Sequence, residues 1–231
     1  MRDPFEKAWF LYNKLERDFI ETTSYVAFET VHGSVWSEKF GELLARTGDL
    51  VDSFFRLMVN SKSLDNETPV KNLRAKILKE QQTNPNWFPK INDFSATFDP
   101  IFQLSSVEVE ADYGLTYYGK LQPFKGFDKQ SPSWWDPYNK VKHEIFEQIE
   151  KKATLENTIN ALAGLFVLNL LHKENQQYLI RHTNVIYSVG PNAEEFMTKG
   201  RIEFELRPSF IGVPKDITNK FIARTQLFTH I

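Results

Sequence analysis

Apolar residues recur at helical spacing in three parts of the chain, and each part predicts a helix with a buried face. Pro4 suits the first turn of a helix, and the stripe that follows it consists of Phe5, Ala8, Trp9, Tyr12, Leu15 and Phe19. Ser37 is a favourable N-cap, and it precedes a longer stripe of Phe40, Leu43, Leu44, Thr47, Leu50, Val51, Phe54, Phe55 and Met58. The third part, Leu155–Leu171, is apolar around nearly its whole circumference, which indicates a central buried helix.

Two more helices are expected from capping residues and spacing. The first runs from about Val70 to Gln82 and carries the only dense group of basic residues, Lys71, Arg74, Lys76 and Lys79. We interpret this group as a solvated helix face. The second has Asp136 as its N-cap and Pro137 at its first position, and we expect it to run to about Lys152. On a helical wheel its buried arc contains Tyr138, Val141, Ile145, Phe146 and Ile149.

The segment 84–131 is rich in Pro, Gly and aromatic residues, and its pattern predicts no helix. Apolar and acidic residues alternate in one stretch, which predicts a strand through Val107, Glu108, Val109, Glu110, Ala111 and Asp112. A turn at Tyr113-Gly114 leads to a second expected strand, Leu115–Leu121, and completes a hairpin. The three acidic residues, Glu108, Glu110 and Asp112, are compatible with a metal site or with a solvent-facing strand edge. We favour the strand edge, because charged side chains keep such an edge soluble.

The expected fold is therefore mainly α: a helical bundle over residues 1–178, with a β-hairpin inserted near 102–122. Two alternating stretches near the C-terminus, Asn184–Val189 and Arg201–Arg207, predict strands. We therefore expect a β-rich C-terminal extension, residues 179–231, packed on the bundle.

Composition narrows the class of protein. The absence of Cys excludes disulfides and Cys-based zinc sites, and a net charge of −2 leaves no global positive field for nucleic acid. The longest apolar run, Ala161–Leu168, is too short to span a bilayer, and the opening MRDPFEKAWF lacks the apolar core of a signal peptide. We expect a cytoplasmic protein that does not bind membranes. Its 20 Phe, 5 Trp and 8 Tyr can fill a large core or form a partner surface.

The helix expected from Pro137 carries the main candidate site. Asn139 and His143 are one turn apart on the flank of its apolar arc. Lys142 falls inside the arc, so its ammonium must reach outwards or find an anion. With Trp134 and Trp135 at the entrance and a positive helix N-terminus nearby, these residues form a plausible phosphate-handling cluster.

Each of these residues also has a structural interpretation. Trp134 and Trp135 are more often core anchors than ligand platforms, and a lone His143 is more often structural or exposed than catalytic. We find no P-loop, no G-x-S-x-G elbow and no H-E-x-x-H spacing, so we expect no metal and no cofactor. The Arg181-His182 pair is interpreted as surface.

The segment SPSWWDPYNKVKH, followed by ATLENTINALAGLFVLNLL, resembles a group of uncharacterised bacterial and archaeal HEPN-like proteins. In that group a W-W-x-x-Y-N-x-V-K-H helix precedes a long helix rich in Asn, Ala and Leu. The upstream YVAF and the helix from Ser37 also fit, and the resemblance covers roughly residues 20–175. HEPN domains are helical bundles that usually dimerise. Many are metal-independent ribonucleases of toxin–antitoxin, phage-defence and CRISPR systems.

The resemblance implies roles for individual residues. The HEPN motif is an Arg, usually a polar residue, and a His four to six residues after the Arg. Asn139 and His143 match it, whereas Tyr138 stands where the Arg belongs. Lys142 would replace the missing positive charge, although its ammonium is a point charge and lacks the two-pronged donor geometry of an Arg guanidinium.

Two functional hypotheses follow. In the first, the protein cleaves or binds RNA in stress or phage defence, as a homodimer in which the His143 helices of the two subunits face each other. His143 would move the ribose 2′-hydroxyl proton, Lys142 would stabilise charge on phosphorus, and Asn139 would orient the phosphate. Three aromatic residues would contact the substrate: Tyr138, Trp134 and Trp135. In the second hypothesis the protein is a non-catalytic interaction module that binds a partner protein or a nucleotide, and the missing Arg favours it.

Overall fold

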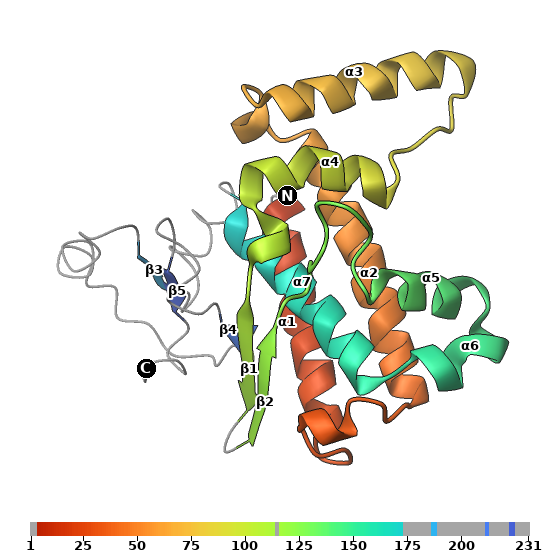
Figure 1. Cartoon of the computed structure of the whole chain (residues 1–231), viewed down its shortest axis with the longest axis vertical. Helices are drawn as coiled ribbons and strands as arrows, with labels where there is room; N and C mark the ends of the chain where they lie inside the picture. The colour runs from red at the N-terminus through yellow and green to blue at the C-terminus, as the bar shows by residue number, and fades with distance from the viewer. Residues whose placement is uncertain (1–3, 114–115, 173–185, 189–210, 213–221, 225–231) are drawn as a thin grey trace.

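The computed structural model describes residues 4–113, 116–172, 186–188, 211–212 and 222–224. Within them the chain is mainly helical, as predicted, with a small antiparallel hairpin (Figure 1). The helices are α1 (Pro4–Thr22), α2 (Glu38–Val59), α3 (Thr68–Thr83), α4 (Ile91–Phe102), α5 (Trp135–His143), α6 (Ile145–Lys152) and α7 (Leu155–Leu171). The strands are β1 (Val109–Tyr113), β2 (Thr116–Leu121), β3 (Ile186–Ser188), β4 (Ile211–Gly212) and β5 (Ile222–Arg224).

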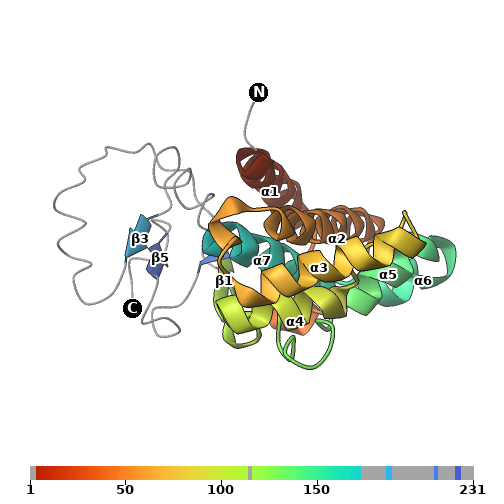
Figure 2. The same ribbon diagram turned by 90° about the horizontal axis from the view of Figure 1, so that it is seen from above.

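The centre of the core lies between α1, α2 and α7, which lie side by side (Figures 1 and 2). Near the start of α7, Thr158 Oγ1 donates to the carbonyl of Phe40 on α2 at 3.2 Å. At the other end, the ring of Phe5 stacks on His172 and packs edge-on against Phe54. Hence α2 and α7 run parallel, and α1 runs antiparallel to both. Of the 17 residues of α7, 13 are buried, which confirms the prediction of a central helix.

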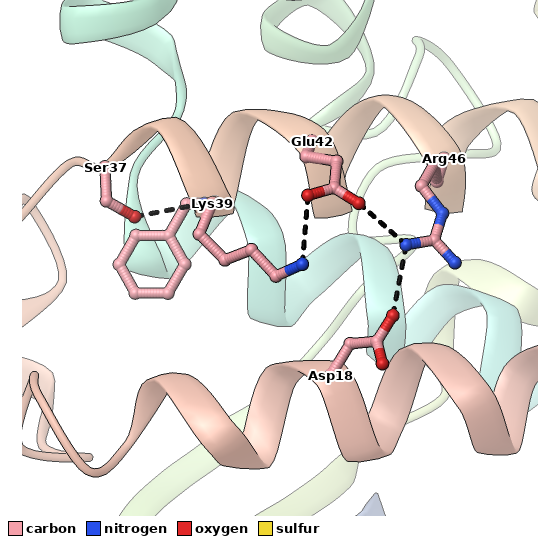
Figure 3. Close-up of polar contacts among 6 residues, drawn as sticks. Asp18, Ser37, Lys39, Glu42 and Arg46 are labelled. Carbon is pink, nitrogen blue, oxygen red and sulfur yellow. Dashed lines mark hydrogen bonds and ion pairs between the residues drawn. The ribbon is translucent and has the colours of Figure 1, made fainter.

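Polar contacts fix the first half of α2 (Figure 3). Ser37 Oγ accepts from the backbone N–H of Phe40 at 3.0 Å, which confirms the predicted N-cap. Arg46 donates to Glu42 within the helix at 2.9 Å and to Asp18 on α1 at 3.1 Å. Only the pair with Asp18 joins α2 to α1. Because these side chains are partly exposed, ion pairs add little stability here, and the apolar contacts supply most of it.

Helix α4 is a correction to the prediction that 84–131 contains no helix. Its apolar residues Phe94 and Phe98 are one turn apart, and both stack on Phe55 of α2 with ring centroids 5.2 and 5.6 Å apart. The side chain of Asp93 accepts from the backbone N–H of Lys90 at 2.8 Å and caps the first turn. Pro100 near the end of the helix obscured the helical signal in the sequence.

The hairpin of β1 and β2 forms as predicted, with Val109 opposite Leu121. Val109 and Ala111 are buried while Glu108 and Glu110 are half-buried, so the alternation is reproduced. Strand β1 is central, because its second edge pairs with β4 in a sheet of order β2-β1-β4.

In the C-terminal region, the predicted strand Asn184–Val189 contains the described β3, which pairs with β5. The predicted strand Arg201–Arg207 and the Arg181-His182 pair lie outside the described residues. Across the described helices, none combines the length and the apolar character needed to cross a bilayer.

Candidate functional site

The helix predicted from Asp136 to about Lys152 is two helices, α5 and α6, and this corrects the sequence interpretation. The chain leaves helical geometry at Glu144, which has φ −132° and ψ 41°. Helix α5 also begins two residues earlier than predicted, at Trp135 rather than Pro137, so Asp136 lies in the first turn and pairs with Lys140 at 3.1 Å instead of capping.

The break changes which residues are buried. In a continuous helix Ile145 and Phe146 would share the apolar arc of Tyr138 and Val141. Instead, Tyr138 and Val141 are buried, whereas Ile145 is 44% exposed and Phe146 is 99% exposed. The later residue of the predicted arc, Ile149, does pack on the core and lies close to Gly41 of α2.

Trp134 is a core residue with no exposed surface. Its indole N–H donates to the carbonyl of Pro123 at 2.7 Å, and its ring meets Phe124 edge-on with centroids 6.3 Å apart. Trp135 is 8% exposed and tilts against Tyr138 at 5.0 Å. Both rings therefore occupy the anchor position that the structural interpretation described, and Trp134 offers no face to a ligand.

Tyr138 fills a notch in α2 that only a glycine provides. A Cβ added to Gly48 would lie 2.2 Å from Tyr138 Cδ2, which is far inside van der Waals contact. The ring is 2% exposed, and its hydroxyl donates to Asp49 Oδ1 at 2.7 Å. Burial raises the pKa of Tyr138 to about 12, so the hydroxyl stays protonated and remains a donor.

The Lys142 ammonium is paired with an anion, Asp49, which is one of the two outcomes that the sequence allowed. This ammonium donates to Asp49 Oδ1 at 2.6 Å and to the Tyr138 hydroxyl at 3.0 Å. The hydrogen bond to Asp49 is the main cause of the raised pKa of Lys142. The side chains of Lys142 and Asp49 are 40% and 54% exposed, so water screens the pair. A phosphate that approached Lys142 would have to compete with Asp49.

Asn139 and His143 are one helical turn apart, but the surroundings of His143 differ from the expectation. His143 is the last residue of α5 and exposed, so it lies at the negative C-terminal end of that helix rather than near a positive N-terminus. Asn139 is half-buried. Among the described residues, no hydrogen bond joins Lys142 to Asn139 or His143.

Sequence reasoning missed two residues of this site, Gly48 and Asp49. Both lie on α2, and Asp49 is 93 positions from Lys142. A glycine inside a strongly amphipathic helix costs about 1 kcal/mol relative to alanine. A glycine retained at this cost indicates that another side chain packs closely against the helix at that position, and this was the signal in the sequence for Gly48. Asp49 carried no signal beyond its place on the polar face.

The part of the chain that the structure describes contains no group of three or more His, Asp or Glu side chains able to hold a metal. No protein-family model matches the chain, and no curated protein or solved structure matches it significantly.

Proposed function

We propose that this protein is a non-catalytic interaction module whose contact surface is the α5–α6 corner, defined as Lys142, His143, Glu144, Ile145 and Phe146. One observation supports the proposal most directly. Phe146 is 99% exposed, more than any other large hydrophobic residue in the described part of the chain, and Ile145 beside it is 44% exposed. Adjacent exposed apolar side chains with charged neighbours are typical of a protein contact site.

The occupant we propose is a second copy of this chain. Glu144 precedes helix α6 and Glu147 lies in its first turn, whereas Lys151 and Lys152 lie in its last turn. If two copies of α6 pair antiparallel about a twofold axis, the acidic end of each faces the basic end of the other. Phe146 and Ile145 would then be shielded from water between the helices, and the charges would fix their direction.

Light scattering at micromolar concentration tests this proposal. We expect a mass of twice the 27.0 kDa chain for the natural protein and a single chain mass for Phe146→Asp, because the change places a charge in the apolar contact. Leu78→Asp is the matched control, since Leu78 is 68% exposed on α3, and it should remain dimeric. A natural protein that stays monomeric, or a dimeric Phe146→Asp variant, contradicts the proposal.

A charge exchange tests the antiparallel direction. Glu147→Lys should weaken the dimer because it places two like charges together across the contact. Adding Lys151→Glu to the same chain should restore association, since opposite charges again face each other. Sedimentation equilibrium gives the three dissociation constants. A double variant weaker than Glu147→Lys alone would exclude this pairing, even if the protein dimerises elsewhere.

A metal-independent ribonuclease acting in stress or phage defence is the second candidate, and the exposure of His143 beside Lys142 favours it. We expect such activity to persist in EDTA, to leave a 2′,3′-cyclic phosphate and to disappear in His143→Ala. Asp49→Asn should raise the rate, because it removes the carboxylate that competes for Lys142. Tyr138→Arg is unsuitable as a test, because the Gly48 notch holds the tyrosine ring. If RNA stays intact in every assay, the ribonuclease candidate is excluded and the interaction module is the remaining proposal.

A further inference from the structure

One segment of this protein carries an excess of positive over negative residues. Residues 68–90, which form α3 and the loop before α4, contain five basic residues, Lys71, Arg74, Lys76, Lys79 and Lys90, and a single acidic one, Glu80. The whole chain has a net charge of −2, so the remainder is markedly acidic. Helix α3 lies across one end of the bundle, away from the paired strands β1 and β2 (Figures 1 and 2).

Two of these cations form ion pairs within the fold, and three do not. Arg74 pairs with Asp65 at 2.7 Å and donates to the carbonyls of Val59 and Ser61, while Lys76 pairs with Asp93 at 2.6 Å. Lys71, Lys79 and Lys90 are exposed, and none of them is in an ion pair among the described residues. Lys90 precedes α4, and its backbone N–H donates to the Asp93 carboxylate at 2.8 Å, so its charge also acts on Asp93. Lys71 and Lys79 are two turns apart on α3, about 12 Å along its axis.

Aromatic rings lie in the loop at the end of this basic helix. Phe88 is 54% exposed, and the Arg56 guanidinium lies 4.6 Å from its ring centroid. Trp87 is half-buried, with the Lys76 ammonium 5.6 Å from its ring. The guanidinium covers one face of the Phe88 ring and is itself held by Asp52 at 2.7 Å, so a nucleobase can stack on the other face of the ring.

The loop is held in place without a ligand. Gln81 Nε2 donates to the carbonyl of Trp87 at 3.1 Å, and the Trp87 N–H donates to the carbonyl of Asn84 at 2.9 Å. Pro85 and Pro89 further restrict the backbone on either side. Binding would therefore cost little ordering entropy.

We infer that the α3 platform, defined as Lys71, Lys79, Trp87, Phe88 and Lys90, binds single-stranded nucleic acid. Bases stack on the exposed half of Phe88, and the three lysines lie against backbone phosphates. The chemistry favours this ligand over an acidic peptide, because a peptide satisfies the lysines but leaves the exposed ring without a flat partner. This surface is separate from the α5–α6 corner, so the inference does not depend on the proposed function.

Fluorescence anisotropy of the full chain with labelled oligo(dU) and oligo(rU), each of about 12 nucleotides, tests the inference at low salt. Phe88→Ala should weaken binding by about fivefold or more, because stacking of one base on the ring contributes at least that much. The pair Lys71→Gln and Lys79→Gln should reduce the slope of log affinity against log salt by about 1.4, which corresponds to two phosphate contacts. Comparing oligo(dU) with oligo(rU), which differ only at the 2′ position, decides whether the 2′-hydroxyl contributes.

Matched controls lie outside both proposed surfaces. Tyr25→Ala removes a ring that is 85% exposed, and Lys14→Gln on α1 with Lys120→Gln on β2 removes the same charge, yet neither should change affinity. All of the substituted side chains are exposed, so thermal melts should stay unchanged. The inference is overturned if neither oligonucleotide binds, if Phe88→Ala binds as tightly as the natural protein, or if polyglutamate competes as well as unlabelled oligonucleotide.

Discussion

Phe166→Ala should lower the free energy of unfolding by about 3–5 kcal/mol, the largest single effect that we expect. Phe166 is 1% exposed at the centre of α7, and its ring packs against Tyr12 and Trp9 of α1 with centroids 5.5 and 6.4 Å apart. Removing the ring leaves a cavity that three packed helices cannot close without moving apart.

A urea melt followed by circular dichroism measures this loss. Phe146→Ala is the matched control, because it removes the same ring from a position that is 99% exposed, and at protein concentrations too low for dimerisation it should cost under about 0.5 kcal/mol. A loss below about 1 kcal/mol for Phe166→Ala would mean that α7 is not the centre of the core.

Gly48→Ala should destabilise the protein by about 2 kcal/mol, although the same change usually stabilises a helix. Alanine in the interior of α2 gains about 1 kcal/mol in helix propensity. Its Cβ, however, would lie 2.2 Å from Tyr138 Cδ2, and overpacking of this kind costs about 1–3 kcal/mol. The displaced ring would also lose the hydrogen bond from its hydroxyl to Asp49, so the unfavourable effects win.

The double variant Gly48→Ala with Tyr138→Ala separates the two contributions. Without the ring there is no clash, so in the Tyr138→Ala background the glycine substitution should be neutral or stabilising by up to about 1 kcal/mol. Denaturant melts of the four proteins give the coupling energy. A Gly48→Ala protein that is more stable than the natural one would show that α5 does not sit on α2 as described.

The docking of α5 on α2 matters for function because it sets the direction of the chain at the α5–α6 corner. Tyr138 in the Gly48 notch and Lys142 on Asp49 hold the last turns of α5, immediately before the break at Glu144. If that docking fails, Phe146 loses its fixed position. Gly48→Ala should therefore also weaken the proposed dimer, without any change in the residues of the contact itself.

The sequence by itself determined α1, α2, α3, α7 and the hairpin. In α1, α2 and the hairpin the buried residues repeat with the period of the secondary structure, as Phe5 to Phe19 and Val109 to Ala111 do, so local spacing was sufficient. Helix α7 was predicted from an apolar run with no polar face. The sequence also showed that the Lys142 ammonium must either reach outwards or find an anion, because a cation within an apolar arc is unfavourable.

Only the tertiary structure decided the rest. Spacing alone favoured one helix from Asp136 to Lys152, and the break at Glu144 left Phe146 exposed rather than buried. The spacing of residues also could not identify Asp49 as the partner of Lys142, or Gly48 as the residue against which the Tyr138 ring packs. The physical reason is the same in each case: periodicity reports which face of an element is buried, whereas the side chain that it meets comes from a distant part of the chain and depends on how the helices pack together.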